Sequence, residues 1–166
     1  MALTATIKAG INATHTSALD LGTATFPLSL LQSISLSDGT GANEADRIFT
    51  DTRTLAASAT EDLDLSGSLT NAFGTVTFAR IKAVLITASS ANTNNVQVTR
   101  PASNGVPLFI AAGDGIAVLP GGMFLWACSD ATGVAVTAST GDLLTLTNSA
   151  GSTSVTYSIV VIGASA

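Results

Sequence analysis

The stretch VTFARIKAVLITAS, residues 76–89, decides the fold class because its composition favours a β-strand. Val, Ile, Thr and Phe are enriched in strands, where successive side chains point to opposite faces. One face would then begin with two cations and end apolar: Phe78, Arg80, Lys82, Val84 and Ile86. The other face would be wholly apolar and would belong to the core: Ala79, Ile81, Ala83 and Leu85.

The two cations in this stretch, Arg80 and Lys82, are candidates for either a structural or a binding role. We expect both to pair with carboxylates on an adjacent strand, such as Asp62 or Asp64, and so to have a structural role. Opposite charges across a strand pair stabilise a sheet by about 0.2–1 kcal/mol. The alternatives are an anion or ligand site and a charged contact to another subunit.

Short apolar runs continue along the chain with a period of two and are separated by clusters of Gly, Asn, Asp and Ser. From about residue 60 the spacing of these runs is short and regular, which is typical of an antiparallel sandwich or barrel. Only EADRIF (44–49) and LTNAFG (69–74) suggest helix, and neither would exceed a turn or two. We therefore predict an all-β fold, an antiparallel, jelly-roll-like β-sandwich.

The first part of the chain differs from the rest, since KAGINATHTSALDLGTATF (8–26) is only weakly patterned. It leads into FPLSLLQSISL (26–36), where Phe26, Leu28 and Leu30 would share one face of a strand. We predict an N-terminal arm or hairpin over residues 1–45, packed on the domain or on a neighbour. The sandwich domain would then occupy residues 46–166.

The composition indicates a surface made for contact with other proteins. Charged residues make up 10% of the 166 residues, against roughly 25% in an average soluble domain. A Ser-, Thr- and Ala-rich exterior with few charges suits burial against other copies or a larger assembly. The net charge of −5, with six cations, lacks the pattern that binds phosphate backbones, so we expect no nucleic-acid partner.

The chain also lacks the usual signs of export and membrane insertion. MALTATIKAG (1–10) has no charged segment followed by an apolar one, so we expect no signal peptide. No apolar run approaches the roughly 18–20 residues of a spanning helix. We therefore expect no membrane association and assembly in the cytoplasm.

Two residue types that often carry chemistry occur once each. His15, the single histidine, lies in the polar stretch NATHTSA and is expected to face solvent or another subunit. Cys128, the single cysteine, excludes an internal disulfide. Alternation places Cys128 with Phe124 and Trp126 on one face, where a buried thiol behaves as a small apolar residue. No histidine lies near it in sequence to activate a nucleophile.

The carboxylates form no convincing site either. Asp62 and Asp64 would lie on one strand face with Glu61 pointing the other way, which makes a glycosidase pair conceivable. Sugar clefts usually carry aromatic platforms, however, and the chain has one Trp and one Tyr.

GDG (113–115) and TGD (140–142) lack the acidic run of a calcium loop and are expected to be hairpin turns. GTGANEADR (39–47) lacks the lysine of a phosphate-binding loop. We predict no catalytic, cofactor-binding or metal-binding residues, no small-molecule substrate, and a protein that is not an enzyme.

Several short motifs in fixed order, over roughly residues 60–163, resemble those of a family of small virion structural proteins of tailed bacteriophages. They are FARIKA (78–83), NTNNV (92–96), PGG (120–122) before an apolar strand, GDLL (141–144) and the final VTYSIVVIG (155–163). The resemblance implies a β-sandwich virion component and carries no catalytic motif. It does not extend to the first 45 residues.

This resemblance makes a capsid decoration or cement protein the expected function. Such a protein would lie on the capsid surface, bind the major capsid protein, form homo-oligomers and bridge neighbouring capsid subunits. The alternative is a tail or head-fibre module involved in host attachment. We expect that removing residues 1–40 leaves a folded β domain but weakens capsid binding.

Overall fold

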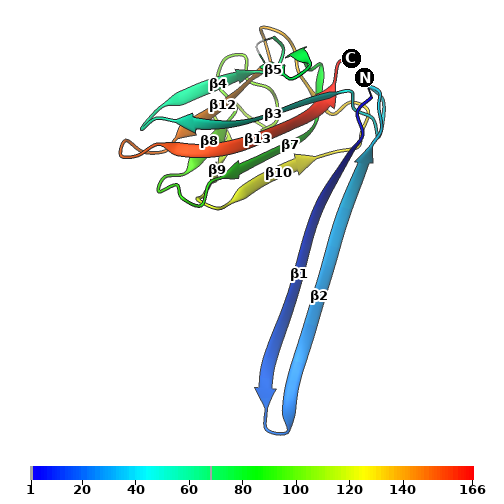
Figure 1. Ribbon diagram of the computed structural model, residues 1–166, viewed down its shortest axis with the longest axis vertical. Helices are drawn as coiled ribbons and strands as arrows, with labels where there is room; N and C mark the ends of the chain where they lie inside the picture. Colours follow the sequence, from blue (N-terminus) through cyan, green and yellow to red (C-terminus); the bar gives the residue numbers. More distant parts are fainter. Residues whose placement is uncertain (1, 68) are drawn as a thin grey trace.

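The computed structural model describes residues 2–67 and 69–166, and the elements in this part of the chain are all strands (Figure 1). The predicted all-β class is therefore confirmed. The first strands are β1 (Ala5–Leu19), β2 (Gly22–Leu36), β3 (Arg47–Leu55), β4 (Thr60–Asp64), β5 (Leu69–Asn71) and β6 (Gly74–Val76). The later ones are β7 (Arg80–Ala88), β8 (Val96–Thr99), β9 (Gly115–Val118), β10 (Met123–Ala127), β11 (Val134–Ala135), β12 (Leu143–Asn148) and β13 (Val155–Ala164).

Two antiparallel sheets form the body as a sandwich. The first has the strand order β10-β7-β13-β3, with β11 also pairing with β7. The second has the order β4-β12-β8-β9, and β5 and β6 form a separate short hairpin. The predicted antiparallel sandwich is confirmed, while its jelly-roll connection pattern stays a prediction.

The core lies between the two sheets and is built by alternation along each strand. On β13, in the middle of the first sheet, Val155, Tyr157, Ile159 and Val161 point into the core. Leu144 and Leu146 of β12 reach it from the second sheet. Leu63 of β4 and Leu65 just after it are also fully buried in this core.

Strand β7 departs from its predicted faces because of a β-bulge. The β7–β13 register shifts at Ile162/Gly163, so Lys82 has no opposite residue and the alternation changes phase there. Val84 and Ile86 therefore face the core together with Ile81, whereas Ala83 and Leu85 lie on the outer face. The prediction that Ala83 and Leu85 belong to the main core was wrong.

A glycine permits the close approach of strands at this bulge. A Cβ added at Gly163 would lie 2.1 Å from the carbonyl oxygen of Arg80 and 2.7 Å from the Phe78 ring. No side chain fits in that space, so the pairing on either side of Lys82 depends on glycine at this position.

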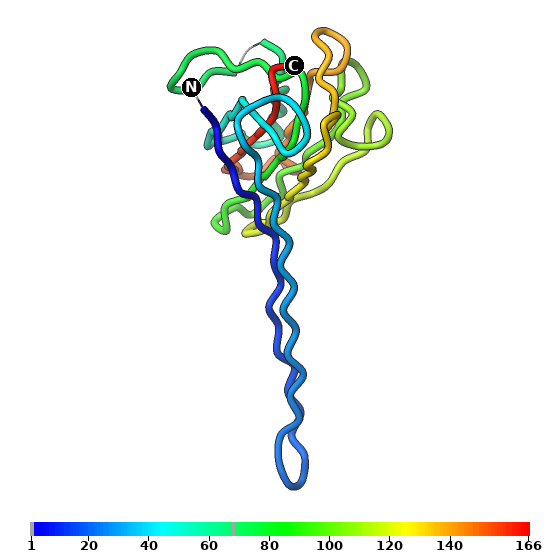
Figure 2. Tube along the Cα trace, turned by 90° about the vertical axis from the view of Figure 1, so that its right-hand side faces the viewer, coloured from blue at the N-terminus to red at the C-terminus, as the bar shows by residue number. Residues whose placement is uncertain are grey.

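The first two strands form a long hairpin that projects from the sandwich, which confirms the expected N-terminal arm or hairpin (Figures 1 and 2). We call the hairpin Ala5–Leu36 the arm. Its two strands have 15 residues each and pair without interruption from Ala5–Leu36 to Leu19–Gly22. At about 3.4 Å per residue the arm is about 50 Å long.

Candidate interaction surface

The arm has one apolar and one polar face, and its pairing register determines which residues lie on each. Directly paired residues of an antiparallel ladder point to the same side. Beyond its base, one side carries most of the large apolar groups, with His15, Ser17 and Gln32 between them. We call its apolar residues the apolar arm face: Ala9, Ile11, Ala13, Leu19, Phe26, Leu28 and Leu30. The opposite side is mostly Ser, Thr and Asn, and we call it the polar arm face: Asn12, Thr14, Thr16, Thr23, Thr25, Ser29 and Ser33. Leu31 is the large apolar exception on the polar side, where it lies next to Gly10.

The apolar arm face is open to solvent along its length. Phe26 is 68% exposed, Ile11 62%, Leu30 54% and Leu28 47%. An isolated two-stranded hairpin is at best marginally stable in water and needs a further strand or a packing surface. An exposed apolar face of this kind is typical of a site that contacts another protein.

The body covers only the base of this face. Leu36 is fully buried there, and Ile7 and Ile34 pack with Ala83 and Ile162 on the outer face of the first sheet. This second apolar cluster fixes the arm to the sandwich. It also explains why Ala83 is buried although it points away from the main core.

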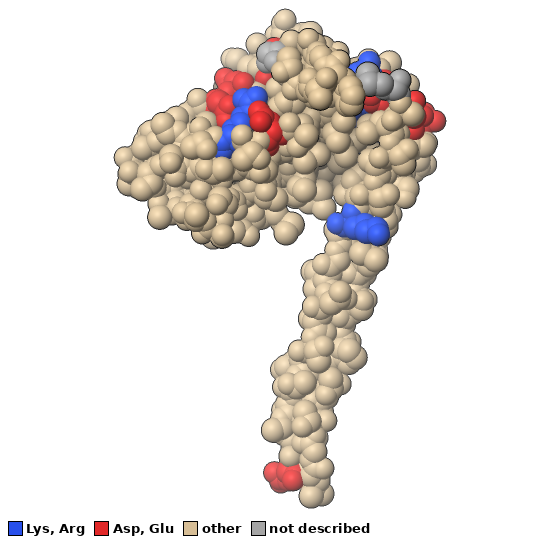
Figure 3. All heavy atoms as spheres, viewed as in Figure 1, with Lys and Arg blue, Asp and Glu red and all other residues tan. Residues whose placement is uncertain are grey.

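The part of the arm between Lys8 and the turn at Asp20, which we call the shaft, carries no Asp, Glu, Lys or Arg. In the arm, Lys8 near the base and Asp20 in the turn are the only Asp, Glu, Lys or Arg residues. Figure 3 shows the shaft between them as an uninterrupted neutral surface. Recognition by this surface therefore depends on apolar contact and shape rather than on ion pairs.

A second apolar surface lies on the outer face of the first sheet, beside the base of the arm. Leu85 is paired with Leu125 on one side and with Val160 on the other, which makes an apolar row across three strands. Together with Met123 and Ile7 these residues line a hollow of about 290 Å³, which we call the basal hollow. Met123 is 70% exposed, so this surface is also open to a partner.

Lys82, predicted to pair with a carboxylate, instead binds backbone carbonyls. Its side chain is fully buried, and Nζ donates to the carbonyl oxygens of Asp130 and, at 3.3 Å, Gly41. The first carbonyl belongs to the loop after β10 and the second to the segment that joins the arm to β3. Lys82 thus fixes the base of the arm, and the predicted pairing with Asp62 or Asp64 was wrong.

Arg80 acts in a similar way beside it. Its guanidinium donates to the carbonyl oxygen of Ala131 at 3.0 Å. In the same loop, the hydroxyl and amide of Thr132 donate to the Asp130 carboxylate, and these hydrogen bonds hold the pKa of Asp130 below its usual value. Both cations therefore hold loops in place, and the expected pairing of Arg80 with Asp62 or Asp64 was wrong as well.

Asp62 and Asp64 lie on β4, in the second sheet, and serve local structure. Asp62 accepts a hydrogen bond from the Thr145 hydroxyl at 2.5 Å, which links β4 to β12. Asp64 accepts from the amide of Ser66 at 2.9 Å and from its hydroxyl at 3.1 Å, which shapes the turn after β4. The conceivable glycosidase pair therefore gains no support from these contacts.

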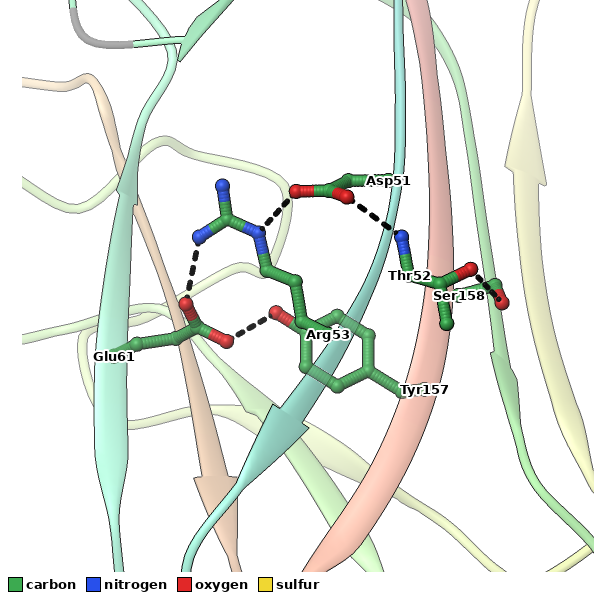
Figure 4. A network of polar contacts seen from close by, with 6 residues as sticks. All are labelled: Asp51, Thr52, Arg53, Glu61, Tyr157 and Ser158. Carbon is green, nitrogen blue, oxygen red and sulfur yellow. Dashed lines mark hydrogen bonds and ion pairs between the residues drawn. The ribbon is translucent and has the colours of Figure 1, made fainter.

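Glu61 points the opposite way, as predicted, and joins a polar network between the two sheets that sequence reasoning missed (Figure 4). It accepts hydrogen bonds from Arg53 Nη1 at 2.7 Å and from the Tyr157 hydroxyl at 2.5 Å. Arg53 Nε also donates to Asp51 at 2.9 Å. Because β4 belongs to one sheet and β3 and β13 to the other, these contacts close one edge of the sandwich.

The network raises the pKa of two of its members. Burial raises the pKa of the Tyr157 phenol, and the hydrogen bond to Glu61 raises it further. Burial lowers the pKa of Arg53, but its hydrogen bonds to Glu61 and Asp51 outweigh this and the pKa is raised overall. Tyr157 is thus neutral and Arg53 charged, which matches the donor role of each toward Glu61.

The two residue types that occur once each, and Trp126, lie on the arm and in or just after β10. His15 is exposed on the apolar side of the arm, opposite Phe26, in line with its expected solvent-facing or inter-subunit position. Cys128 is half-buried just after β10, and its amide donates to the carbonyl of Lys82. Trp126 is half-buried and packs on the main core.

The two glycine–aspartate stretches are turns. Asp114 accepts a hydrogen bond from the amide of Ala111 at 2.8 Å in the loop between the paired strands β8 and β9, as expected of a hairpin connection. Thr140–Asp142 lies at a tight turn closed by the antiparallel bridge between Thr137 and Gly141, as expected of a hairpin turn, although β11 and β12 on either side lie in different sheets. Within residues 2–67 and 69–166 no group of three or more His, Cys, Asp or Glu is placed to hold a metal ion. None of the described segments is a helix of the length and apolarity needed to cross a bilayer.

Comparison with known proteins gives no match: no family model, no curated protein and no solved structure is similar to this chain.

Proposed function

We propose that this chain is a structural protein of a tailed-bacteriophage virion that decorates the capsid and reinforces it by bridging neighbouring subunits. The observation that carries the proposal is the arm, a hairpin about 50 Å long that projects from a compact sandwich and exposes one apolar face along an uncharged shaft. Large exposed apolar surfaces mark sites of contact with other molecules, and a protein that links neighbours needs such a surface. The motif resemblance over residues 60–163 supports a virion component.

The body suits the same role. Where β3 and β13 pair, the outer face of the first sheet carries hydrogen-bonded hydroxyl pairs. Thr52 is bonded to Ser158 at 2.8 Å and Thr54 to Thr156 at 3.0 Å. Such a face can be covered by another protein without the large cost of desolvating charges. We propose the major capsid protein as the partner of the body, at the outer surface of the capsid after assembly in the host cytoplasm.

Reinforcement follows from repetition rather than from strong single contacts. Each copy contributes a modest interface, but many symmetric copies share the internal pressure, and simultaneous contacts raise the effective affinity of each. Homo-oligomers with closed symmetry would match the symmetry of the shell.

The test is the number of copies of this chain in purified virions, measured by quantitative gel densitometry against the major capsid protein. Hundreds of copies per particle support a decoration protein. A few to tens of copies would instead favour a tail or head-fibre module involved in host attachment. Absence from the particle would overturn both assignments.

Binding provides the second readout. Full-length protein added to capsids that lack it should bind to saturation in a fixed ratio to the capsid subunit. It should also raise the temperature or the denaturant concentration at which the shell opens. Binding without any gain in shell stability would argue against reinforcement.

A further inference from the structure

We propose that the apolar arm face is covered by the same face of a second copy of this chain, with the two arms packed antiparallel. In this arrangement the turn of each arm reaches the basal hollow of the other copy. The inference goes beyond the proposed function and is tested on the purified chain, so each can fail without the other.

The first argument is that the apolar arm face needs a cover that its own chain does not supply. Among the described residues, the body packs against the base of the arm around Ile7, Ile34 and Leu36. Beyond this base, Ile11, Phe26 and Leu30 remain more than half exposed. Their cover must therefore come from another molecule.

The second argument is that an identical arm provides the matching shape and chemistry. Two sheets pack well face to face when they share the same twist and their strands are aligned within about 30°. A second arm meets this condition by definition, and contact between like faces is the self-complementary kind found in two-fold dimers. The shaft has no charge between Lys8 and Asp20 that would select a charged partner.

The third argument fixes the orientation. The base of each apolar arm face already rests on its own sandwich, so a parallel partner would collide with that body. An antiparallel partner avoids the collision, because its free turn rather than its base approaches the sandwich. Leu19 and Leu21 near that turn are 61% and 103% exposed. They would meet Met123, Leu125 and Leu85 at the basal hollow.

The estimated size of the contact places it among small, reversible interfaces. The free part of each arm has about 11 paired positions, or about 36 Å of length, and a two-stranded face is about 10 Å wide. Two such faces hide roughly 700 Å² together, and the two turn-to-hollow contacts bring the total near the roughly 1,000 Å² at which specific interfaces begin. We therefore expect a reversible dimer in the micromolar range that becomes stable when many copies are held close together.

The first experiment is sedimentation velocity of the full-length protein from about 1 μM to about 500 μM, a range that brackets such a dissociation constant. The mass should rise reversibly from one chain to two. Phe26→Asp and Leu28→Asp, on the apolar arm face, should each raise the dissociation constant at least about tenfold. Thr25→Asp and Ser29→Asp add the same charge to the same strand on the polar arm face and should leave it unchanged.

All four positions are exposed, so the variants should keep the circular dichroism spectrum of the parent chain. A chain that stays monomeric over the whole range would overturn the proposal. So would equal effects of substitutions on the two faces, because then charge alone, and not the apolar arm face, would control association.

The second experiment tests the antiparallel orientation by cross-linking in a Cys128→Ser background. Leu21→Cys combined with Met123→Cys should give disulfide-linked dimers under mild oxidation, whereas neither single substitution should do so. Efficient cross-linking of Leu21→Cys alone would place the two turns together. That result would mean parallel arms and would overturn the arrangement.

Discussion

The buried ammonium of Lys82 lies 3.3 Å from the carbonyl oxygen of Gly41 and so ties β7 to the segment that leads from the arm into the body. The same ammonium binds the carbonyl of Asp130 in the loop after β10. One side chain therefore joins three parts of the chain that are far apart in sequence. The direction of the arm depends on this joint together with the apolar cluster around Leu36.

Replacing Lys82 with Met should destabilise the fold by about 2–3 kcal/mol, because the carbonyl oxygens of Gly41 and Asp130 would lose the buried ammonium that donates to them. Met has a similar length, so little cavity forms and the effect reports the lost hydrogen bonds. Urea unfolding followed by Trp126 fluorescence measures the change. Hydrogen exchange of the amides in residues 37–45 should accelerate as the joint loosens.

The control for this substitution is Lys8→Met, which removes an exposed lysine from the arm. It should change the unfolding free energy by less than about 0.5 kcal/mol. Equal effects of the two substitutions would contradict the structural role given to Lys82.

The Tyr157–Glu61 contact makes stability depend on alkaline pH. The folded state raises the pKa of Tyr157 above the value of about 10 in an unfolded chain. Below pH of about 10 both states keep the proton and the contribution of Tyr157 to stability is complete. Above it the unfolded state alone loses the proton, so stability falls as the pH rises.

Because Tyr157 is the single tyrosine, its ionisation can be read directly from the near-ultraviolet absorbance of phenolate. We expect no phenolate signal near pH 10 in the folded protein, and ionisation only together with unfolding. In Tyr157→Phe the alkaline loss of stability should become shallower. A normal titration of the folded protein would show that the phenol is not held between the sheets.

The all-β class and most strands could be predicted because alternation is a local property of the sequence. The phase of β7 could not, since the bulge at Lys82 depends on the pairing of β7 with β13, in which Ile81 lies opposite Gly163, about eighty residues away. Strand β1 could not be predicted either. Its positions on the apolar side of the arm include Ala9, Ala13 and His15, which differ little in hydrophobicity from their neighbours. The two faces of the arm emerge only when β1 and β2 are aligned in register.

The partners of the charged residues were missed for a related reason. A sequence shows carboxylates that could pair with Lys82, but backbone carbonyls carry no sequence signal, and the fold brings two of them to its ammonium. Glu61 could be assigned to the opposite side from Asp62, yet its contact with Tyr157 required knowing that β4 and β13 meet at one edge of the sandwich.

Trp126→Ala should cost about 2–3 kcal/mol of unfolding free energy. Removal of a fully buried aromatic ring costs roughly 3–5 kcal/mol, and Trp126 is half-buried against the main core. Chemical denaturation followed by circular dichroism measures it, since the variant lacks tryptophan. Met123→Ala on the exposed side of the same strand should cost less than about 0.5 kcal/mol. A loss below about 1 kcal/mol for Trp126→Ala would mean that its ring does not support the core.

Shortening the arm should separate attachment from folding. Replacing residues 10–31 with Asn-Gly closes the hairpin at the Ala9–Gln32 pair, which has the same pairing phase as the natural end at Leu19–Gly22. The base around Ile7, Ile34 and Leu36 stays in place, so unfolding free energy should change by less than about 1 kcal/mol. Self-association should be lost and capsid binding should weaken by at least about tenfold, as multivalent contact is removed.

Deleting residues 1–40, by contrast, removes the fully buried Leu36 and exposes Ala83 and Ile162. The β domain should still fold, but with a loss of about 2–5 kcal/mol, the usual cost of deleting a buried leucine side chain. Comparing the two truncations by urea unfolding and by capsid co-sedimentation tests both roles of the arm. If the shortened arm binds capsids as well as the full-length chain does, the shaft is not the element that attaches this protein to its neighbours.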